Sequence, residues 1–510
     1  MISQVNAACI YHMQVQSVKI ETLVLDGLPE LTVVGGADSK VKESVIRVMR
    51  ALKNAGVKLP PKRVTVNFYP AEVKKTGSHM DLAIAVSIMA AYAFIDRNKI
   101  KDGIFIGEVG LNGDIMPVNG ILPILKPAEK AGVRRCFISA QNAREAALCK
   151  KIEICAASSL RELIDILHGE RSPQRIEVLS DGVKEQEITY DFSDVLGQPA
   201  VKRAAKIAAA GMHSFLMIGA SGTGKTMTAE RVRSILPPLT SEEQLELTEL
   251  YSLAGITDIN RPLMEQRQLR SVSSSVGIKR LAGDLKNKFP GEIVLADRGI
   301  LFLDELSAFP ANTLELIRQA LDEGKVCFED CGRIIRFPSR FMLVSCMNAC
   351  KCGAYPDMAK CTCSIPEIKK HAGKISQSFL ERIDICIHFP RIKYEALSQS
   401  YLKDDETTEM MREEVKKAFE MQRQRYKNTS MISNRDLTPD VIKNYCKLNK
   451  AQETLLKETY ESLHLSVRTV HSILRVSRTI ADLEQSEYIR TKHLIEAIAL
   501  RNIDRNFWKV

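Results

Sequence analysis

Two patterns of apolar residues alternate along residues 1–168. Short apolar runs bounded by glycine, proline or polar residues predict strands at 31–36, 63–70 and 103–110. Apolar residues that recur at helical spacing predict helices at 40–55, 81–95 and 122–132. Because strands and helices follow one another in this way, the pattern indicates an α/β domain.

The rest of the chain divides into three further segments. The polar stretch 169–190 contains glycine, serine and proline and is predicted to be a linker. Strands and helices alternate again over 191–390, which predicts a parallel sheet with crossover helices. The periodicity over 391–510 is helical almost throughout, with helix starts predicted at Thr438-Pro439 and Ser466. The predicted fold class is therefore α/β with a helical C-terminal domain.

Composition places the chain among ordinary globular proteins. Hydrophobic residues make up 45% and charged residues 26%, which excludes wholesale disorder. The longest apolar run, 82–93, contains Ser87 and is too short to cross a membrane. No basic segment followed by an apolar one begins the chain, so no secretory signal is predicted. With thirteen cysteines and no export signal, we expect a reduced, cytoplasmic setting rather than a disulfide framework.

The formal net charge of +10 is a mild basic bias for this length, and it permits a nucleic-acid partner without requiring one. Part of the bias is concentrated in 261–290, which holds seven basic and two acidic residues. A solvated surface loop is the simpler interpretation of such a cluster. A surface that binds phosphates is the alternative.

The most specific motif matches G-x-x-x-x-G-K-[ST] and consists of Gly219, Ala220, Ser221, Gly222, Thr223, Gly224, Lys225 and Thr226. The apolar run 215–218 before it predicts a strand, and 226–236 after it predicts a helix. Glycines let backbone N–H groups turn toward a polyphosphate, and a helix N-terminus adds positive potential. We expect Lys225 to reach the β- and γ-phosphates of ATP and Thr226 to offer its hydroxyl to Mg²⁺.

Two acids follow a second apolar strand, 299–303. Asp304 is expected to hold Mg²⁺ through water, and Glu305 to polarise an attacking water, which is the chemistry of hydrolysis. A third strand, 341–347, ends at Asn348, whose amide can hold the γ-phosphate and the water. A surface turn is the alternative for the acids, but their separation of about 80 residues from the glycine-rich loop favours a nucleotide site.

Together these motifs resemble the AAA+ ATPases of the magnesium-chelatase-like branch. The matching segments are DFSDVLGQ at 191–198, GILFLDEL at 299–306 and SFLERID at 378–384. The resemblance implies a homo-hexameric ring in which Arg382 is an arginine finger for the neighbouring subunit's nucleotide. It also implies that Arg468 belongs to a sensor-2 helix within a C-terminal helical lid. On the residues alone, surface arginines on a helix are the alternative interpretation of both.

The N-terminal domain resembles the ChlI-type domain, which is similar in fold to the proteolytic (S5-type) domain of Lon. The residues that carry this likeness lie at 27–29, 41–44, 61–67, 75–82 and 107–113. The whole chain is thus similar to the YifB/ComM family, whose competence members are implicated in DNA branch migration.

Two departures from these families bear on activity. A Lon-type peptidase needs a serine activated by a lysine base. In the register of the motif Gly77-Ser78-His79-Met80-Asp81, the serine position falls at His79 and the lysine position at Pro123, so peptidase activity is not expected. The basic segment also lacks the family's Phe-Arg-x-Pro-His-His motif and has LRSVSS at 269–274.

Four cysteines follow the pattern C-x-C-x₈-C-x-C, at Cys350, Cys352, Cys361 and Cys363. Four thiolates at this spacing can close a tetrahedral Zn²⁺ site on a short loop. Four reduced surface thiols are the alternative, but they invite oxidation. We therefore predict a structural zinc, and no catalytic one because no ligand position is left open.

Two substrates remain open for the predicted ATPase. In a DNA motor, a hexamer would place 261–290 and the hairpin 325–340 around a central pore. Lys325, Arg333, Arg336 and Arg340 would then neutralise the phosphates of single-stranded or branched DNA. The alternative is a protein remodeller that uses the Lon-like domain as an adaptor, although no aromatic pore loop is evident. Metal chelation is weaker still, because no integrin-like metal site is found.

Overall fold

The computed structural model describes residues 2–173, 190–285, 289–330, 333–391, 406–429 and 431–501. They form two compact units that are not continuous in sequence. The N-terminal unit comprises Met1–Val183, Ser241–Glu265 and Asp284–Pro290. The C-terminal unit comprises Lys184–Thr240, Gln266–Gly283 and Gly291–Val510. Most of the predicted linker, 174–189, lies outside the described residues, and the predicted four-part division stays a prediction.

Seven described strands of the N-terminal unit form one sheet in the order β3-β4-β2-β1-β5-β8-β9. Their bounds are β1 Ile2–Tyr11, β2 Gln14–Leu25, β3 Glu30–Val34, β4 Arg63–Tyr69, β5 Gly103–Ile106, β8 Arg135–Ser139 and β9 Glu153–Ala157. The three predicted strands are confirmed as β3, β4 and β5. The long antiparallel pair β1 and β2 was not predicted; residues 7–10 of β1 are all buried, so the alternation that marks a half-exposed strand is missing there.

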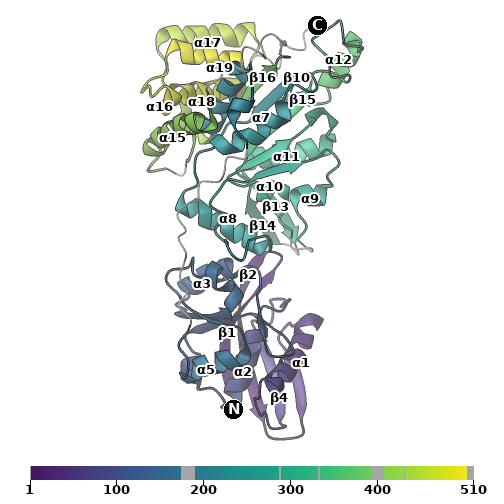
Figure 1. The fold of residues 1–510 in the computed structure, drawn as a ribbon, viewed down its shortest axis with the longest axis vertical. Coiled ribbons are helices and arrows are strands. Elements are labelled where there is room, and N and C mark those ends of the chain that lie inside the picture. Colours follow the sequence, from purple (N-terminus) through teal and green to yellow (C-terminus); the bar gives the residue numbers. More distant parts are fainter. Residues whose placement is uncertain are drawn as a thin grey trace. The chain divides into compact units, whose positions relative to one another are not determined.

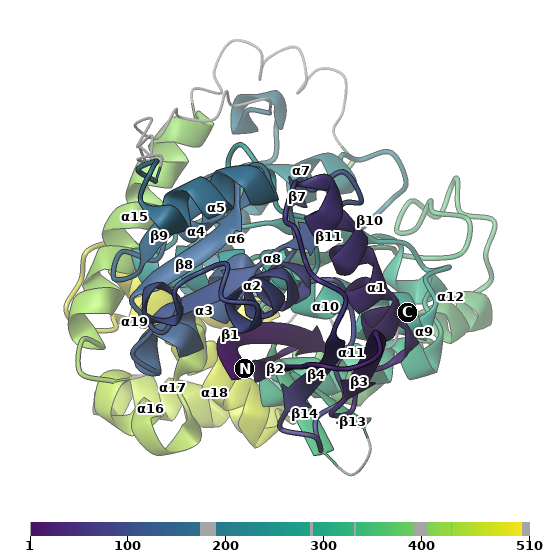
Figure 2. The same cartoon turned by 90° about the horizontal axis from the view of Figure 1, so that it is seen from below.

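Helices cover both faces of this sheet. On one face α1 (Ser39–Asn54), α2 (Asp81–Ala91) and α5 (Leu160–His168) share a core with β1 and β2. The other core contains α3 (Ile121–Lys130) and α4 (Ala143–Ala146), beside the parallel strands β8 and β9 (Figure 2). The three predicted helices are confirmed as α1, α2 and α3. Every residue of α2 is buried, so the apolar run at 82–93 is a core helix.

The segment Ser241–Glu265 belongs to the N-terminal unit, although the residues on both sides of it belong to the C-terminal unit. Its helix α8 (Ser241–Leu253) lies against α3. Ser252 at the end of α8 accepts a hydrogen bond from the Gly120 N–H at 2.9 Å, and Leu245 and Leu253 pack on the core below. Among the described helices of both units, none is long and apolar enough to cross a membrane.

Within the described part of the C-terminal unit, five strands form a parallel sheet in the order β11-β12-β15-β10-β16. Figure 1 labels three of these strands, β15, β10 and β16. The strands are β10 Phe215–Gly219, β11 Leu269–Val272, β12 Ile300–Leu303, β15 Met342–Asn348 and β16 Ile385–Phe389. This confirms the predicted parallel sheet. Because β10, β15 and β12 are consecutive neighbours, the loops that follow them meet at one edge of the sheet.

The remaining elements of the C-terminal unit surround this sheet. They are α6 (Pro199–Gly211), α7 (Lys225–Val232), α9 (Ile278–Ala282), α10 (Glu292–Leu295), α11 (Ala311–Glu323), α12 (Ile365–Ala372) and α13 (Gln377–Leu380). A two-stranded hairpin, β13 (Lys325–Asp330) and β14 (Arg333–Pro338), follows α11. The C-terminal helices are α15 (Thr408–Arg425), α16 (Pro439–Tyr445), α17 (Lys450–Ser462), α18 (Val467–Leu483) and α19 (Thr491–Arg501). These confirm the helical C-terminal region and both predicted helix starts.

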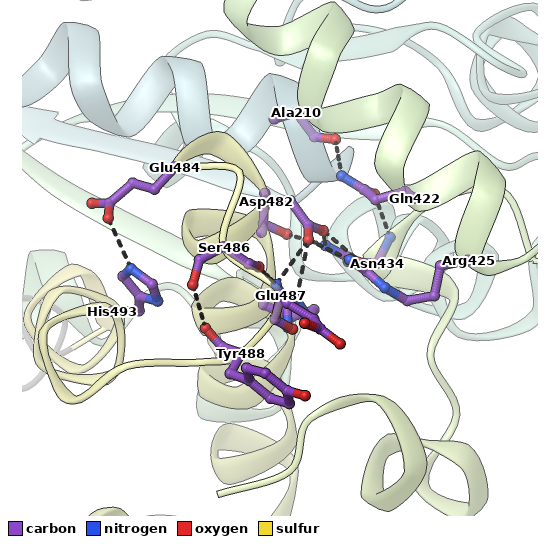
Figure 3. A network of polar contacts seen from close by, with 12 residues as sticks. Ala210, Gln422, Arg425, Asn434, Asp482, Glu484, Ser486, Glu487, Tyr488 and His493 are labelled. Carbon is purple, nitrogen blue, oxygen red and sulfur yellow. Dashed lines mark hydrogen bonds and ion pairs between the residues drawn. The ribbon is translucent and has the colours of Figure 1, made fainter.

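A buried polar network orients α18 against α15 (Figure 3). Asp482 on α18 is fully buried and accepts hydrogen bonds from Arg425 Nη1 at 2.9 Å, Asn434 Nδ2 at 2.8 Å and Arg478 Nε at 3.1 Å. Burial alone would lower the pKa of Arg425, but the Asp482 carboxylate outweighs it and raises that pKa above its usual value. Such a satisfied network holds α18 in one position, because breaking it leaves a charge unpaired in the interior.

Candidate functional site

The glycine-rich motif folds as the predicted strand, loop and helix. β10 ends at Gly219 and α7 begins at Lys225. Gly222 and Gly224 have φ angles of +74° and +100°, a conformation that residues with a Cβ adopt only with strain. The glycines at these two positions are therefore required by the turn that leads into the helix N-terminus.

Lys225 joins the loop to the end of β15. Its side chain is largely buried, and Nζ donates to the carbonyl oxygens of Gly219 at 3.1 Å and Ala220 at 2.6 Å. Nζ also donates to Oδ1 of Asn348 at 3.2 Å. Burial lowers the pKa of Lys225, although nearby Asp304 and Glu305 act in the opposite direction. A cation is thus held at the loop beside the amide that sequence analysis singled out.

The two acids lie directly after β12. Asp304 Oδ2 accepts a hydrogen bond from the Thr226 hydroxyl at 3.1 Å, and its Oδ1 accepts one from the Glu305 N–H at 3.0 Å. Glu305 has a φ angle of +52°, in the left-handed region. For a residue other than glycine this costs about 1 kcal/mol or more, and such strain gathers at functional sites.

These groups enclose a cavity of about 400 Å³. It is lined by Ser221, Gly222, Thr223, Gly224, Lys225, Thr226, Met227, Asp304, Glu305, Met347 and Asn348. Gly219 and Ala220, the other two motif residues, lie behind it and bind Lys225. The Thr226 hydroxyl and Asp304 carboxylate supply the hard oxygen ligands that suit Mg²⁺, which proteins bind through few carboxylates plus substrate phosphates. The donor set therefore fits a metal-complexed polyphosphate.

Of the described residues that line this cavity, none is Arg382 or Arg468. Both arginines meet instead at Asp322, near the end of α11. Arg382 donates from Nη2 to Oδ2 at 2.8 Å and from Nε to Oδ1 at 3.1 Å, and Arg468 donates to Oδ1. Arg318 also donates to Oδ2, at 2.8 Å. Burial would raise the pKa of Asp322, but Arg382, Arg468 and Arg318 together hold it below its usual value.

The motif SFLERID contributes a second carboxylate that sequence analysis did not single out. Asp384 is buried at the start of β16, where Oδ2 accepts from the Ser214 N–H at 3.3 Å and Oδ1 from the Ser472 hydroxyl of α18. Burial would raise the pKa of Asp384, but Arg475, His213 and Ser472 hold it far below its usual range. It therefore ties the sheet to the helix that carries Arg468.

The four cysteine sulfur atoms gather in one place, and all lie within 4.8 Å of one another. The Sγ–Sγ distances are 3.3 Å for Cys350–Cys352, 3.7 Å for Cys350–Cys361 and 3.6 Å for Cys352–Cys361. The backbone at Ala354, followed by the Cys350 thiol, lowers the pKa of Cys352 to about 5 by hydrogen bonding. Cys350 is buried, while Cys352 is exposed.

Three family models match the chain. They are described as magnesium chelatase, subunit ChlI (residues 191–397), subunit ChlI of Mg-chelatase (residues 20–142) and magnesium chelatase, subunit ChlI C-terminal (residues 405–501). The competence protein ComM of Haemophilus influenzae is 36% identical over 505 residues, which cover 98% of this chain and 97% of ComM. The chain belongs to the YifB/ComM family of magnesium-chelatase-like AAA+ proteins.

Other relatives agree with this placement. The uncharacterized protein YifB of Escherichia coli is 33% identical over 504 residues, covering 99% of this chain and 98% of YifB. Lon protease 2 of Bacillus subtilis is 29% identical over 153 residues, covering 28% of this chain and 27% of the protease.

In this member of the family, the Lon-like motif forms structural contacts. Ser78 donates from its hydroxyl to Glu108 Oε2 at 2.6 Å. His79 is buried, and its Nε2 lies 3.1 Å from the carbonyl oxygen of Asn119. Pro123 is buried within α3. The predicted lack of peptidase activity is not tested by these contacts and stays a prediction.

Not every described basic residue of the segment 261–290 lies at the surface. Arg261 belongs to the N-terminal unit, whereas 266–283 belongs to the C-terminal unit. Arg267 is buried and donates to the carbonyl oxygens of Pro237 and Arg298, both at 2.6 Å. Arg270 and Arg280 both pair with Glu292, at 2.6 and 2.7 Å. Its two last lysines, at 286 and 288, lie outside the described residues.

Proposed function

We propose that this protein hydrolyses ATP in the cavity between the glycine-rich loop, β12 and β15. The observation that carries the proposal is that Lys225, Thr226, Asp304, Glu305 and Asn348, which come from three separate segments, line one cavity. When bound with ATP at Thr226 and Asp304, Mg²⁺ would neutralise charge on the phosphate oxygens.

Each residue of the cavity then has a separate task. Lys225 places its cation against the β- and γ-phosphates after exchanging the Gly219 and Ala220 carbonyls for phosphate oxygens. Glu305 orients a water for attack on the γ-phosphorus and takes up its proton. Asn348 donates its amide to the γ-phosphate or to that water. Together these residues would support hydrolysis, with the Glu305 carboxylate as the group that accepts the proton of water.

Arg382 and Arg468 are proposed to act on a neighbouring subunit of a homo-hexamer. Both are cationic, both lie outside the cavity of their own chain, and both are held by the single carboxylate of Asp322. A γ-phosphate from the neighbour offers a stronger partner than a shared carboxylate, since it is more highly charged. The ring thereby couples hydrolysis in one subunit to the arginines of the next.

Single-stranded or branched DNA is the substrate that we propose for this motor. Lys325 and Arg336 are exposed on the same face of the β13–β14 hairpin, because Lys325 pairs with Pro338 and Arg336 with Cys327. Arg340 directly beyond the hairpin is also exposed; the side chain of Arg333 lies outside the description. The name of ComM as a competence protein supports the proposal of DNA as the substrate. The reduced cysteines fit a cytoplasmic location.

The test measures phosphate release from ATP by the full chain, with and without forked DNA, across a series of salt concentrations. We expect DNA to stimulate the rate at low salt and the Lys325→Ala/Arg336→Ala variant to lose most of that stimulation. Lys457→Ala, which removes an exposed lysine from α17, is the matched control and should behave as the parent. Absence of any DNA effect at low salt would reject DNA as the substrate.

A protein remodeller is the second candidate, favoured by the similarity to Lon protease 2. Stimulation of the ATPase by an unfolded protein such as casein, without stimulation by DNA, would decide for it.

We also propose that the cysteine cluster binds a structural Zn²⁺. A tetrahedron with Zn–S bonds of about 2.3 Å requires Sγ–Sγ distances of about 3.8 Å. The shortest distances in the cluster, 3.3 to 3.7 Å, need little change to meet this. Metal analysis of the protein purified under reducing conditions should find one zinc per chain, and less than a tenth of that in Cys361→Ser would tie the metal to the cluster.

A further inference from the structure

The cysteine cluster and the glycine-rich loop are joined by a backbone hydrogen bond. The N–H of Ser221, the third residue of the loop motif, donates to the carbonyl oxygen of Gly353 at 3.0 Å. Gly353 directly follows Cys352 in the chain. The position of this carbonyl therefore depends on the same turn that carries the first two thiols.

The turn at 350–355 is in close contact with the glycine-rich loop. The same turn is also stabilised by a hydrogen bond to a cysteine sulfur. A Cβ on Gly353 would lie 3.2 Å from Cβ of Ser221, so the two backbones approach closely. Gly353 has a φ angle of +77°, which favours glycine. The N–H of Tyr355 donates to Cys350 Sγ at 3.4 Å. Residues 350–355 thus connect a metal-ligating sulfur to Ser221.

The helix that follows the cysteine loop binds the backbone of Asn348, one of the residues that line the cavity. After Cys363 the chain enters α12, where the largely buried His371 donates from Nε2 to the carbonyl oxygen of Asn348 at 3.1 Å. Asn348 precedes Cys350 by two residues and binds Lys225 through its amide. The segment from Asn348 to His371 is therefore closed by a hydrogen bond between its two ends. Between those ends, Gly353 contacts the glycine-rich loop.

The cysteine loop contains turns only, between β15 and α12. Its buried side chains include Cys350 and Tyr355, but most of 351–364 is exposed, and a tetrahedral metal would close the loop and remove its conformational freedom. Gly353 adjoins Cys352 and accepts the hydrogen bond from the Ser221 N–H. Restricting the backbone at Cys352 therefore also restricts Gly353 and Ser221.

We propose that metal bound at the four cysteines sets the shape of the glycine-rich loop, so that the metal-loaded chain binds Mg-nucleotide more tightly than the metal-free chain. This rests on the proposed nucleotide and zinc sites and adds a coupling between them. The coupling is reciprocal, so bound nucleotide also slows the loss of zinc to a chelator.

The test uses the full chain and a fluorescent ADP analogue with Mg²⁺, whose binding is followed by anisotropy. The chain is measured as loaded with zinc, after a zinc-selective chelator has been applied and removed, and after zinc has been restored. We expect stripping to weaken binding by about threefold to tenfold, the worth of one backbone hydrogen bond, and reloading to reverse it. Zinc loss to the chelator should be slower in the presence of Mg-ADP.

Two variants separate zinc binding from its effect on ADP binding. Gly353→Ala keeps all four thiols but places a Cβ against Ser221; we expect normal zinc content, weaker ADP binding, and little further weakening on stripping. Cys327→Ser removes an exposed cysteine outside the cluster and should match the parent in both measurements.

Equal ADP affinity in the loaded and stripped chains would overturn the coupling while leaving the nucleotide and zinc sites intact. A Gly353→Ala variant that responds to stripping as fully as the parent would overturn the route through Ser221. A zinc-loaded parent that binds no ADP analogue would instead overturn the proposed function, and a chain that takes up no zinc would overturn the metal site itself.

Discussion

The proposed nucleotide cavity and the arginine cluster at Asp322 are both built from charged groups, but they are held in different ways. In the cavity, Lys225 is nearly buried and donates to two carbonyl oxygens and an amide. At the cluster, the side chains of Arg468, Asp322 and Arg382 are 43%, 23% and 13% exposed. Exposed ion pairs are weak, about 0–1 kcal/mol each, and are easily exchanged for another partner. The cavity residues are therefore fixed by buried contacts, whereas the more exposed pairing of Arg468 with Asp322 is more easily exchanged.

The largest expected effect tests whether the arginine cluster serves catalysis. Arg382→Ala should lower kcat for ATP by about 10³–10⁵-fold, the range of an arginine finger, with little change in ADP binding to the same chain. Steady-state phosphate release gives kcat, and titration with ADP gives the affinity for ADP. Arg318→Ala is the matched control, because Arg318 binds the same carboxylate but carries no predicted role. If Arg318→Ala and Arg382→Ala reduce kcat equally, the cluster is only structural.

Within the cavity, Glu305→Gln should lower kcat by about 10²–10⁴-fold, since glutamine cannot accept the proton of water. Its affinity for Mg-ATP should stay close to that of the parent. Glu315→Gln removes an acid on α11 outside the cavity and is the control. Retention of full turnover by Glu305→Gln would contradict the assignment of this carboxylate.

Mixing the two inactive variants sharpens the comparison. Equal amounts of Arg382→Ala and Glu305→Gln should recover about a quarter of the parent rate, because a quarter of randomly mixed interfaces join an intact cavity to an intact arginine. Phosphate release is measured after the variants have exchanged subunits. No recovery from subunits shown to exchange would mean that Arg382 does not act across an interface.

Asp322→Asn should have a smaller effect, lowering kcat by about threefold through loss of a charge-assisted contact that positions Arg382 and Arg468. Nucleotide affinity should not change. Because the pKa of Asp322 is lowered in the folded chain, its pairing is present above the usual carboxyl pKa and is lost only as pH falls through the lower folded value. The ratio of parent to variant kcat should therefore be constant from pH 6 to 8, and a ratio that changes with pH in this range would contradict the pairing.

The smallest expected effect concerns the free energy of unfolding and involves His213, which lies just before β10. His213 is buried between Asp384 and Thr479, and burial lowers its pKa despite the nearby carboxylate. The unfolded chain then binds a proton below about pH 6.5 that the folded chain does not. Thermal unfolding should show the parent losing stability as pH falls from about 6.5 to 5.5, with a shallower loss in His213→Gln. Equal slopes would show that His213 is not the group concerned.

Much of the C-terminal sheet and of the cavity could be predicted from sequence because the signals are local. Gly219 to Thr226, Asp304-Glu305 and Asn348 each follow an apolar strand directly, and parallel strands bring their ends to one edge. The paired thiols of Cys350 and Cys352 are equally local. In each case the chemistry lies within a few residues of the element that positions it.

Contacts between distant segments were not predictable in this way. In the sequence, Asp322 is one acid among many at the end of a helix, and only the fold brings Arg382 and Arg468 to it from 60 and 146 residues away. Likewise, composition grouped Arg267 with a basic surface, although its side chain is buried against backbone carbonyls.

By itself, the sequence determined the alternation of strands and helices in most segments, the glycine-rich loop with its lysine, and the spacing of acids and thiols, because these depend on neighbouring residues. The tertiary structure alone decided that two arginines share one carboxylate, that β1 and β2 form the centre of the N-terminal sheet, and that Gly353 touches Ser221. Those contacts depend on how separate elements pack, and packing energy is a property of the whole core rather than of any local pattern.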